Sequence, residues 1–277
     1  MQAFNDLFNT AKPLIACIHL LPLPGAPRYS GSMQQVYETA LVEADIFSRY
    51  PIDGLIIENF RDVPFYPNQL PAETIAAMAT VTREVVKAVC MPVGVNALRH
   101  DAAAAMAIAT AAQARFIRVN VHMHTVVSDQ GILQGMSHAT LRLRTALRAN
   151  ILIMADVGVK HATPLGARAL AIESHDVTER GMADAIIVSG DFTGSPTQPA
   201  DVEMVRQHTA LPILVGSGVT PDNLSHIYAK TDGMIVGSFF KQDGQADNLV
   251  EEHRVKTFTD AVQSLRNQHD TDLRAEA

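Results

Sequence analysis

Short runs of apolar residues alternate with amphipathic segments along nearly the whole chain. The runs have strand length, are rich in β-branched residues and lack strict alternation, which is typical of strands in a parallel sheet buried on both faces. They predict eight strands, at residues 14–20, 54–60, 93–98, 116–121, 151–157, 185–189, 212–216 and 233–236.

Helical spacing of apolar residues marks most of the segments between these strands. It predicts helices at about 33–49, 72–89, 102–113, 137–149, 164–180 and 246–266, and a short helix at 3–10 that would close the bottom of the fold. Asp101 is a predicted N-cap, and Thr220-Pro221-Asp222 combines an N-cap, a proline at the first helical position and an early acidic residue. Residues 268–277 are expected to fray.

The repetition of strand and helix favours a (β/α)8 barrel, the TIM-barrel fold. An open doubly wound sheet is the main alternative, but the GxGxxG fingerprint expected after its first strand is absent from this sequence. The chain is therefore expected to form one α/β domain over residues 1–277, with a barrel core at about 12–266.

Three stretches between these elements are predicted to be long loops. Residues 21–32 and 61–71 are rich in proline and fit either lids or subunit contacts. Residues 122–136 are long and polar, as functional loops often are.

Composition and charge exclude several classes of protein. The net charge of −7 argues against a general nucleic-acid or anionic-membrane binder, and no apolar run is long enough to span a membrane. The apolar run at 14–23 follows an acidic stretch, so it is not interpreted as a signal peptide. The chain has two cysteines, Cys17 and Cys90, and both lie in or beside apolar runs, which argues against a disulfide framework. We expect a cytoplasmic homo-oligomer.

Small residues end the last three predicted strands. Such residues allow an anion to approach main-chain N–H groups closely, and the loops after strands seven and eight are the usual phosphate site of this fold. The predicted phosphate-binding residues are Ser189, Gly190, Thr193, Gly194, Gly216, Ser217, Gly218, Gly237 and Ser238. The alternative is that these glycines only shape turns.

Polar residues also end the other strands, where a barrel places its active site. The predicted catalytic residues are Glu58, Asp156, Lys160 and His161, and the predicted substrate-binding residues are His19, Asn59, Asn96, Arg118 and Asn120. Because strand side chains alternate, Glu58 and Asn59 must face opposite ways, whereas Cys17 shares a face with His19. The structural alternative is an ion pair of an inward Arg118 with Glu58 or Asp156.

Lys160 and His161 form the pair with the most evident chemistry. A desolvated lysine at the barrel mouth can act as an electrophile or a Schiff-base nucleophile, and a histidine there can transfer a proton near neutral pH. Against this, Lys160 lies beyond its strand, where lysines are usually solvated.

No cofactor is predicted, and a divalent metal is kept as a lesser alternative. His122 and His124 lie two residues apart and, together with Glu58, Asp62 or Asp156, could hold such an ion. Two histidines without an evident third ligand carry little weight.

Nine segments resemble the BtpA/SgcQ family, more closely its SgcQ branch, over about residues 14–258. They are IHLLPLPGAPRY, DGLIIENFRDVPF, PVGVNALRHDAAAAMAIA, FIRVNV, SDQGILQG, DVGVKHATPL, SGDFTGSP, VGSGVTPDNL and DGMIVGSFFKQDG. The resemblance implies a TIM barrel with a phosphate-type site. One branch of the family is associated with photosystem I biogenesis, and the SgcQ branch with a sugar phosphotransferase gene cluster.

These observations lead to one main hypothesis and three alternatives. We expect an enzyme acting on a small phosphorylated sugar or related metabolite, by isomerase or epimerase chemistry. Glu58 or Asp156 would be the base, and Lys160 or His161 the electrophile. The alternatives are an aldolase using Lys160, a non-catalytic phosphometabolite-binding or assembly protein, and a metal-dependent phosphohydrolase.

Overall fold

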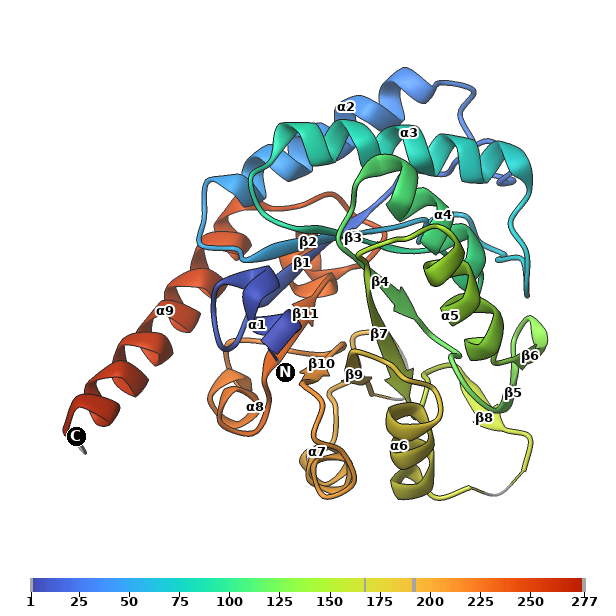
Figure 1. Cartoon of the computed structure of the whole chain (residues 1–277). Coiled ribbons are helices and arrows are strands. Elements are labelled where there is room, and N and C mark those ends of the chain that lie inside the picture. The colour runs from blue at the N-terminus through green and yellow to red at the C-terminus, as the bar shows by residue number, and fades with distance from the viewer. Residues whose placement is uncertain (1, 167, 191–192, 276–277) are drawn as a thin grey trace.

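Parallel strands close into a barrel in the order β1-β11-β10-β9-β7-β4-β3-β2. The computed structural model describes residues 2–166, 168–190 and 193–275 (Figure 1). The barrel strands are β1 (Leu14–His19), β2 (Gly54–Glu58), β3 (Val93–Asn96), β4 (Phe116–Val119), β7 (Leu152–Val157), β9 (Ala185–Val188), β10 (Ile213–Val215) and β11 (Gly233–Val236). Each predicted strand is present, and the predicted TIM barrel is confirmed.

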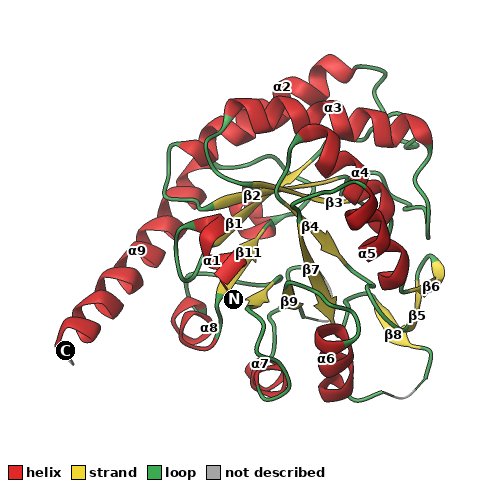
Figure 2. Cartoon of the chain, viewed as in Figure 1, coloured by secondary structure: helices red, strands yellow, loops and turns green. Residues whose placement is uncertain are grey.

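Helices surround the barrel (Figure 2). They are α2 (Met33–Ser48), α3 (Ala72–Ala88), α4 (Ala102–Ala112), α5 (Ser137–Ala146), α6 (Leu170–Glu179), α7 (Pro199–Arg206), α8 (Leu224–Lys230) and α9 (Glu252–Ala275). The predicted N-cap is confirmed, since the Asp101 side chain accepts a 2.8 Å hydrogen bond from the Ala104 amide. None of these helices, within the described ranges, is long and apolar enough to cross a bilayer.

The short helix α1 (Gln2–Phe8) closes the end of the barrel where the strands begin. Phe4 and Phe8 are buried among inward-facing strand residues, and the Phe8 and Phe116 rings lie 5.7 Å apart. The interior at this end is filled with side chains, as in other barrels of this size. The predicted role of the N-terminal helix is confirmed.

The stretch 122–136 is not the long loop that the sequence predicts. It contains a β-hairpin of β5 (Thr125–Ser128) and β6 (Gly131–Gln134), and β8 (Ala162–Pro164) pairs antiparallel with β5. Gly131 follows the two-residue turn with a φ of +101°, a conformation that favours glycine. The small sheet occupies residues 162–164, so α6 starts at Leu170 and not at 164.

Two further helix boundaries differ from the predictions. Asn223, not Thr220, caps α8, because the Asn223 side chain accepts a hydrogen bond of 2.9 Å from the Thr220 amide and holds that segment in a turn. The last helix runs from Glu252 to Ala275, since no glycine or proline interrupts it, so the predicted frayed end is helical as far as residue 275. Residues 276 and 277 lie outside the described part.

A buried ion pair joins α2 to the segment after β11. That segment contains the 3-10 turns η1 (Ser238–Phe240) and η2 (Gln242–Gly244), with Lys241 between them. The Lys241 ammonium lies 2.8 Å from the Glu43 carboxylate, and both side chains are almost fully buried. The other Glu43 oxygen accepts a hydrogen bond of 3.1 Å from the Val250 amide. This pair fixes the end of the β11 loop against the barrel wall.

Candidate active site at the barrel mouth

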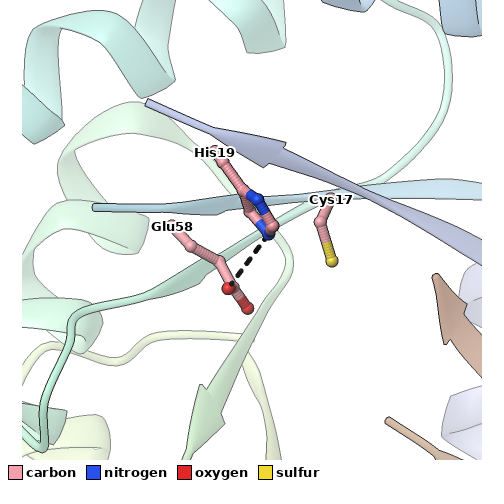
Figure 3. Close-up of side chains that lie close together, drawn as sticks. All are labelled: Cys17, His19 and Glu58. Carbon is pink, nitrogen blue, oxygen red and sulfur yellow. Dashed lines mark ion pairs between the residues drawn. The ribbon is translucent and has the colours of Figure 1, made fainter. Parts of the chain in front are cut away.

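Three side chains form a row at the carboxyl ends of neighbouring strands. His19 on β1 is the register partner of Glu58 on β2, and Glu58 is the partner of Asn96 on β3. All three are buried. The Asn96 amide donates a 3.1 Å hydrogen bond to Oε1 of Glu58, which leaves Oε2 facing Nε2 of His19 at 3.7 Å (Figure 3).

A second cluster lies across the mouth, on β4 and β7. The Arg118 guanidinium donates two hydrogen bonds of 2.9 Å to the two oxygens of Asp156, and Asn120 donates a third of 3.0 Å. Burial opposes the charge on Arg118, but the neighbouring carboxylates of Asp156 and Glu58 outweigh it and raise the pKa of Arg118. The ion-pair alternative is therefore realised, chiefly with Asp156, whose two carboxylate oxygens are both engaged, and also with Glu58, whose Oε1 lies 3.7 Å from Arg118.

A cavity of about 230 Å³ opens between these clusters. Its lining includes Glu58, Phe60, Asn96, Leu98, Arg99, Arg118, Asn120, Lys160, His161 and Thr193. The structure thus gathers, at one cavity, three of the four predicted catalytic residues and three of the five predicted substrate-binding residues. Asp156 lies directly behind the wall that Arg118 and Asn120 form.

Lys160 belongs to this cavity, contrary to the usual solvation of a loop lysine. Burial is the main cause of a shift that lowers the pKa of Lys160 to about 8, and the charge of Arg118 adds to it. The carboxylates of Glu58 and Asp156 act in the opposite direction. Near neutral pH Lys160 is therefore protonated, yet it loses its proton much more easily than an ordinary lysine.

His161 lies at the rim of the cavity and is exposed. Its Nε2 accepts a 3.1 Å hydrogen bond from the Thr193 amide and lies 3.1 Å from the Thr193 hydroxyl. Partial burial, with the charges of Arg99 and Lys160, lowers the pKa of His161. His161 thus connects the loop after β7 to the glycine-rich loop after β9 through its neutral imidazole.

His19 is held in one tautomer. Its Nδ1 lies 2.8 Å from the Ala246 carbonyl oxygen, so this nitrogen carries the proton and Nε2 presents a lone pair toward Glu58. Burial, followed by the charge of Lys241, lowers the pKa of His19 well below its ordinary value. The ring stacks on Phe60 with the centroids 4.4 Å apart.

Cys17 is a site residue to which the sequence analysis gave no chemical role. It lies two residues before His19 on the same face of β1. Burial, followed by the charge of Glu58, raises the pKa of the Cys17 thiol. The Cys17 sulfur, a His19 ring nitrogen and a Glu58 oxygen all lie within 4.8 Å of one another. The sequence could have pointed to Cys17, because side chains alternate along a strand and Cys17 therefore shares a face of β1 with His19.

The glycine-rich turns form a second, smaller cavity next to the first. Its volume is about 30 Å³, and it shares Phe60 and Thr193 with the larger cavity. Its lining also includes Cys17, His19, Gly194, Gly216, Ser217, Gly218, Gly237 and Ser238. Residues Gly218 and Ser238 therefore face one space, as the sequence analysis expects of an anion site.

Two residues that were predicted to bind phosphate, Ser189 and Gly190, have other contacts in the structure. A Cβ on Gly190 would lie 2.4 Å from the Ser195 carbonyl oxygen, so this glycine allows close packing of the loop on itself. The Ser189 hydroxyl accepts a 3.3 Å hydrogen bond from Arg118. The segment between Gly190 and Thr193 falls outside the described residues.

Asn59 faces away from the cavity, as the alternation on β2 requires once Glu58 points inward. Its side-chain oxygen accepts a 2.7 Å hydrogen bond from the Leu98 amide, and its amide donates to the Leu98 carbonyl at 3.2 Å and to Asp62 at 3.1 Å. Asn59 therefore braces the loops after β2 and β3, and we do not include it in the proposed site.

The lesser alternative, a metal site on His122 and His124, is not formed in the structure. His122 is buried, with Nε2 2.8 Å from the Gly181 carbonyl oxygen, and His124 lies 3.4 Å from Asp176 on α6. The strand ends at Val119 and His124 has a φ of +63°, so the extended spacing that would align the two rings is lost. Neither histidine lines the cavity of Glu58.

Comparison with known proteins supports the fold and identifies relatives. Residues 10–264 match the BtpA family. The photosystem I biogenesis protein BtpA of Synechocystis is 40% identical over 92% of this chain and 89% of its own length. An uncharacterized protein of Thermococcus kodakarensis, TK2179, is 40% identical over 92% of this chain and 97% of its own length. Phosphoribosylanthranilate isomerase of Pyrococcus furiosus has a similar fold, with a TM-score of 0.57 and 12% identity over 91% of this chain and 99% of its own.

Proposed function

This chain belongs to the BtpA family, and from that premise we propose that it is an enzyme acting on a small phosphorylated sugar or a sugar-like metabolite. The observation that carries the proposal is the pair of adjoining cavities at the barrel mouth. One is small and lined by glycine and serine, and the other is larger and contains Glu58 and Lys160.

The phosphate would lie in the smaller cavity, against Gly216–Gly218 and Gly237–Ser238. Glycine turns at strand ends let phosphate oxygens approach main-chain N–H groups, which bind anions well. The surrounding charge is favourable, because the positive charges of Lys241, Arg61 and Lys160 all act on His19, which lines this cavity. The smaller cavity would receive the phosphate oxygens next to the glycine turns, and the rest of the metabolite would lie in the larger cavity.

The reacting carbon would lie in the larger cavity, beside a carbonyl group of the metabolite. Proton removal next to a carbonyl requires a base and an electrophile on the developing enolate oxygen. Glu58 supplies the base, since Asn96 is its one short hydrogen-bond donor among the described residues. The Lys160 ammonium supplies the electrophile, whereas Asp156 serves to hold Arg118 in place.

Binding and proton exchange together test this proposal. A panel of sugar phosphates and their unphosphorylated counterparts would be titrated into the full chain by calorimetry, and bound candidates then incubated in D2O and followed by NMR. We expect phosphate-dependent binding and exchange of a hydrogen next to the carbonyl. Equal affinity for phosphorylated and unphosphorylated compounds would refute the phosphate site.

A non-catalytic role in assembly is the second candidate, favoured by the 40% identity to a protein named for photosystem I biogenesis. In that case a phosphometabolite would bind without hydrogen exchange or turnover. Function in cells would then tolerate Glu58→Gln, whereas the enzyme proposal predicts that this variant is inactive.

A further inference from the structure

We propose that Cys17, His19 and Glu58 form a binding site for a divalent transition-metal ion of the zinc type. His19 and Glu58 are register partners on the neighbouring strands β1 and β2, and Cys17 lies two residues before His19 on the same face of β1 (Figure 3). One ligand atom from each residue lies within 4.8 Å of the other two. Ligands bound to one zinc ion at about 2.0–2.3 Å lie about 3.5 Å from one another, so a small inward movement of these side chains completes the site.

The imidazole is already oriented as a metal ligand. Metal-binding histidines usually donate their second ring N–H to a carbonyl or carboxylate, which fixes the tautomer and the ring plane. Nδ1 of His19 has this arrangement with the Ala246 carbonyl oxygen at 2.8 Å, and the ring is further held by stacking on Phe60. The Nε2 lone pair then points into the space beside Glu58.

The arrangement of His19 and Glu58 calls for a positive charge between them. Nε2 of His19 and Oε2 of Glu58 are both acceptors, and they face each other at 3.7 Å in a buried position. Two buried acceptors in that position lack a donor between them, which is unfavourable unless a cation or a proton lies there. Asn96 engages the other oxygen of Glu58, so Oε2 is the one directed at the site.

Two of the nearby basic residues are paired with other carboxylates. Lys241 is paired with Glu43 at 2.8 Å, and Arg118 is paired with Asp156 at 2.9 Å. Arg118 also lies 3.7 Å from Oε1 of Glu58, so Oε2 is the oxygen that remains for the ion, and the Cys17 thiol would lose its proton to the solvent when the metal binds. Sulfur, nitrogen and carboxylate oxygen together form a ligand set that zinc and similar borderline ions favour over magnesium or calcium.

A fourth coordination position would open toward the small cavity. Cys17 and His19 both line that cavity, and Gly237 forms its wall beside them. A Cβ on Gly237 would lie 3.2 Å from Nε2 of His19 and 3.4 Å from the Cys17 sulfur. Three protein ligands and one open position are typical of catalytic rather than structural zinc sites. The fourth ligand would be water or an oxygen of the metabolite, and only this last point rests on the proposed function. With the ion bound, Glu58 would serve as a ligand in place of its role as the base.

Cobalt(II) is the probe that tests the site, because thiolate-to-cobalt charge transfer and ligand-field bands report the donors directly. We expect the full chain to bind one Co²⁺ with both signatures. Cys17→Ser should remove the charge-transfer band and weaken binding by more than about a hundredfold, whereas Cys90→Ser, at the exposed cysteine, should change neither. A missing charge-transfer band in the wild type, or its persistence in Cys17→Ser, would overturn the proposal.

Gly237→Ala provides a variant that leaves every ligand in place. Gly237 has a φ of −116° and a ψ of −80°, and an added methyl group would lie 3.2 Å from Nε2 of His19 and 3.4 Å from the Cys17 sulfur, so it would press on both ligands and crowd the ion. We expect weaker Co²⁺ binding, and the unfolding midpoint measured without metal reports the cost to the fold itself. Unaltered Co²⁺ affinity would contradict the proposal. A cobalt spectrum without any sugar-phosphate binding would support the metal site and refute the proposed function. Sugar-phosphate binding without a cobalt spectrum would do the reverse.

Discussion

Arg118 and Asp156 meet through two hydrogen bonds of 2.9 Å between the neighbouring strands β4 and β7 at the barrel mouth. Neither side chain is exposed by more than 4%. Because Asn120 and Ser189 also bond to this pair, it forms one wall of the larger cavity rather than a free acid and base. Removing the charge of Asp156 would leave the buried guanidinium with only Glu58, 3.7 Å away, as a counter-charge, and breaking a buried ion pair is among the more costly changes in a protein interior.

Asp156→Asn should therefore destabilise the chain by about 3 kcal/mol. The amide keeps the size of the carboxylate, so the loss reports the charge and not a void. Chemical denaturation measures the free energy of unfolding. Asp260→Asn, which removes the exposed partner of Lys256 on α9, is the matched control and should leave stability unchanged. Equal effects of the two substitutions would contradict the prediction.

Lys160 should give the folded chain a specific pH dependence. Its folded pKa of about 8 lies below the ordinary value of 10.5, so between these values the unfolded chain binds more protons at this position. Stability must then rise with pH across that interval, and the gain is lost as pH falls through about 8. Lys160→Met removes the titrating group. The free energy of unfolding of the wild type, minus that of the variant, should thus increase with pH.

The measurement is a series of denaturation curves at several pH values for the two proteins. Lys87→Met, at an exposed lysine on α3, serves as the matched variant. A difference that stays constant or falls with pH would show that Lys160 is not desolvated in the folded chain.

The role of Lys160 in turnover can be separated from a Schiff-base role by a charge-preserving change. Lys160→Met should lower the rate of hydrogen exchange by about 10²–10⁴-fold, because the developing negative charge loses its partner. Lys160→Arg should retain part of the rate if the ammonium acts as an electrophile. No measurable rate in Lys160→Arg, together with an adduct trapped by borohydride at Lys160, would instead support the aldolase alternative.

The effects of substituting Lys241 and Glu43 on the free energy of unfolding should be strongly coupled, because the two side chains form a buried ion pair. Lys241→Met leaves Glu43 buried without a partner and should cost about 3–5 kcal/mol of stability. Replacing both, with Glu43→Leu and Lys241→Met, should recover much of that loss, because no unpaired charge then remains. A double-mutant cycle from denaturation curves measures the coupling, and additive single effects would argue against it.

Gly218 should be intolerant of any side chain. It has a φ of +67°, and a Cβ there would lie 2.5 Å from the backbone nitrogen of Pro196. Gly218→Ala should therefore abolish phosphate-dependent binding in calorimetry and lower the unfolding midpoint. Gly31→Ala is a matched control, since Gly31 has a φ of +84° but nothing within 4 Å of its Cβ position. The control should lose only about 1–2 kcal/mol, the cost of the left-handed backbone alone.

Local patterns were sufficient to predict the barrel. Each buried parallel strand is a short apolar run, and Asp101 marks a helix start through its own side chain. The alternation of β1 and β2 also required Cys17 to share a face with His19, and Glu58 and Asn59 to face opposite ways, but it did not show that Asn59 is the one turned outward. These signals depend on residues that are close in the sequence, so they can be read without knowing the fold.

Long-range pairings could not be predicted in the same way. The partner of Lys241 is Glu43, which lies 198 positions away, and neither residue stands in a motif. His122 and His124 looked aligned only because the strand was assumed to continue past Val119. Cys17 gained a chemical context only when β1 and β2 were seen in register with the Gly237 turn beside them.

The two ends of the chain differ in what can be attached to them. Helix α1 is packed beneath the strands through Phe4 and Phe8, whereas α9 extends outward from the barrel as far as Ala275 (Figure 1). An affinity handle or a surface-immobilisation tag is therefore best fused behind α9. Fused there, the tag would avoid the interior packing of the opposite terminus and would let the ligand titrations be carried out on a tethered protein.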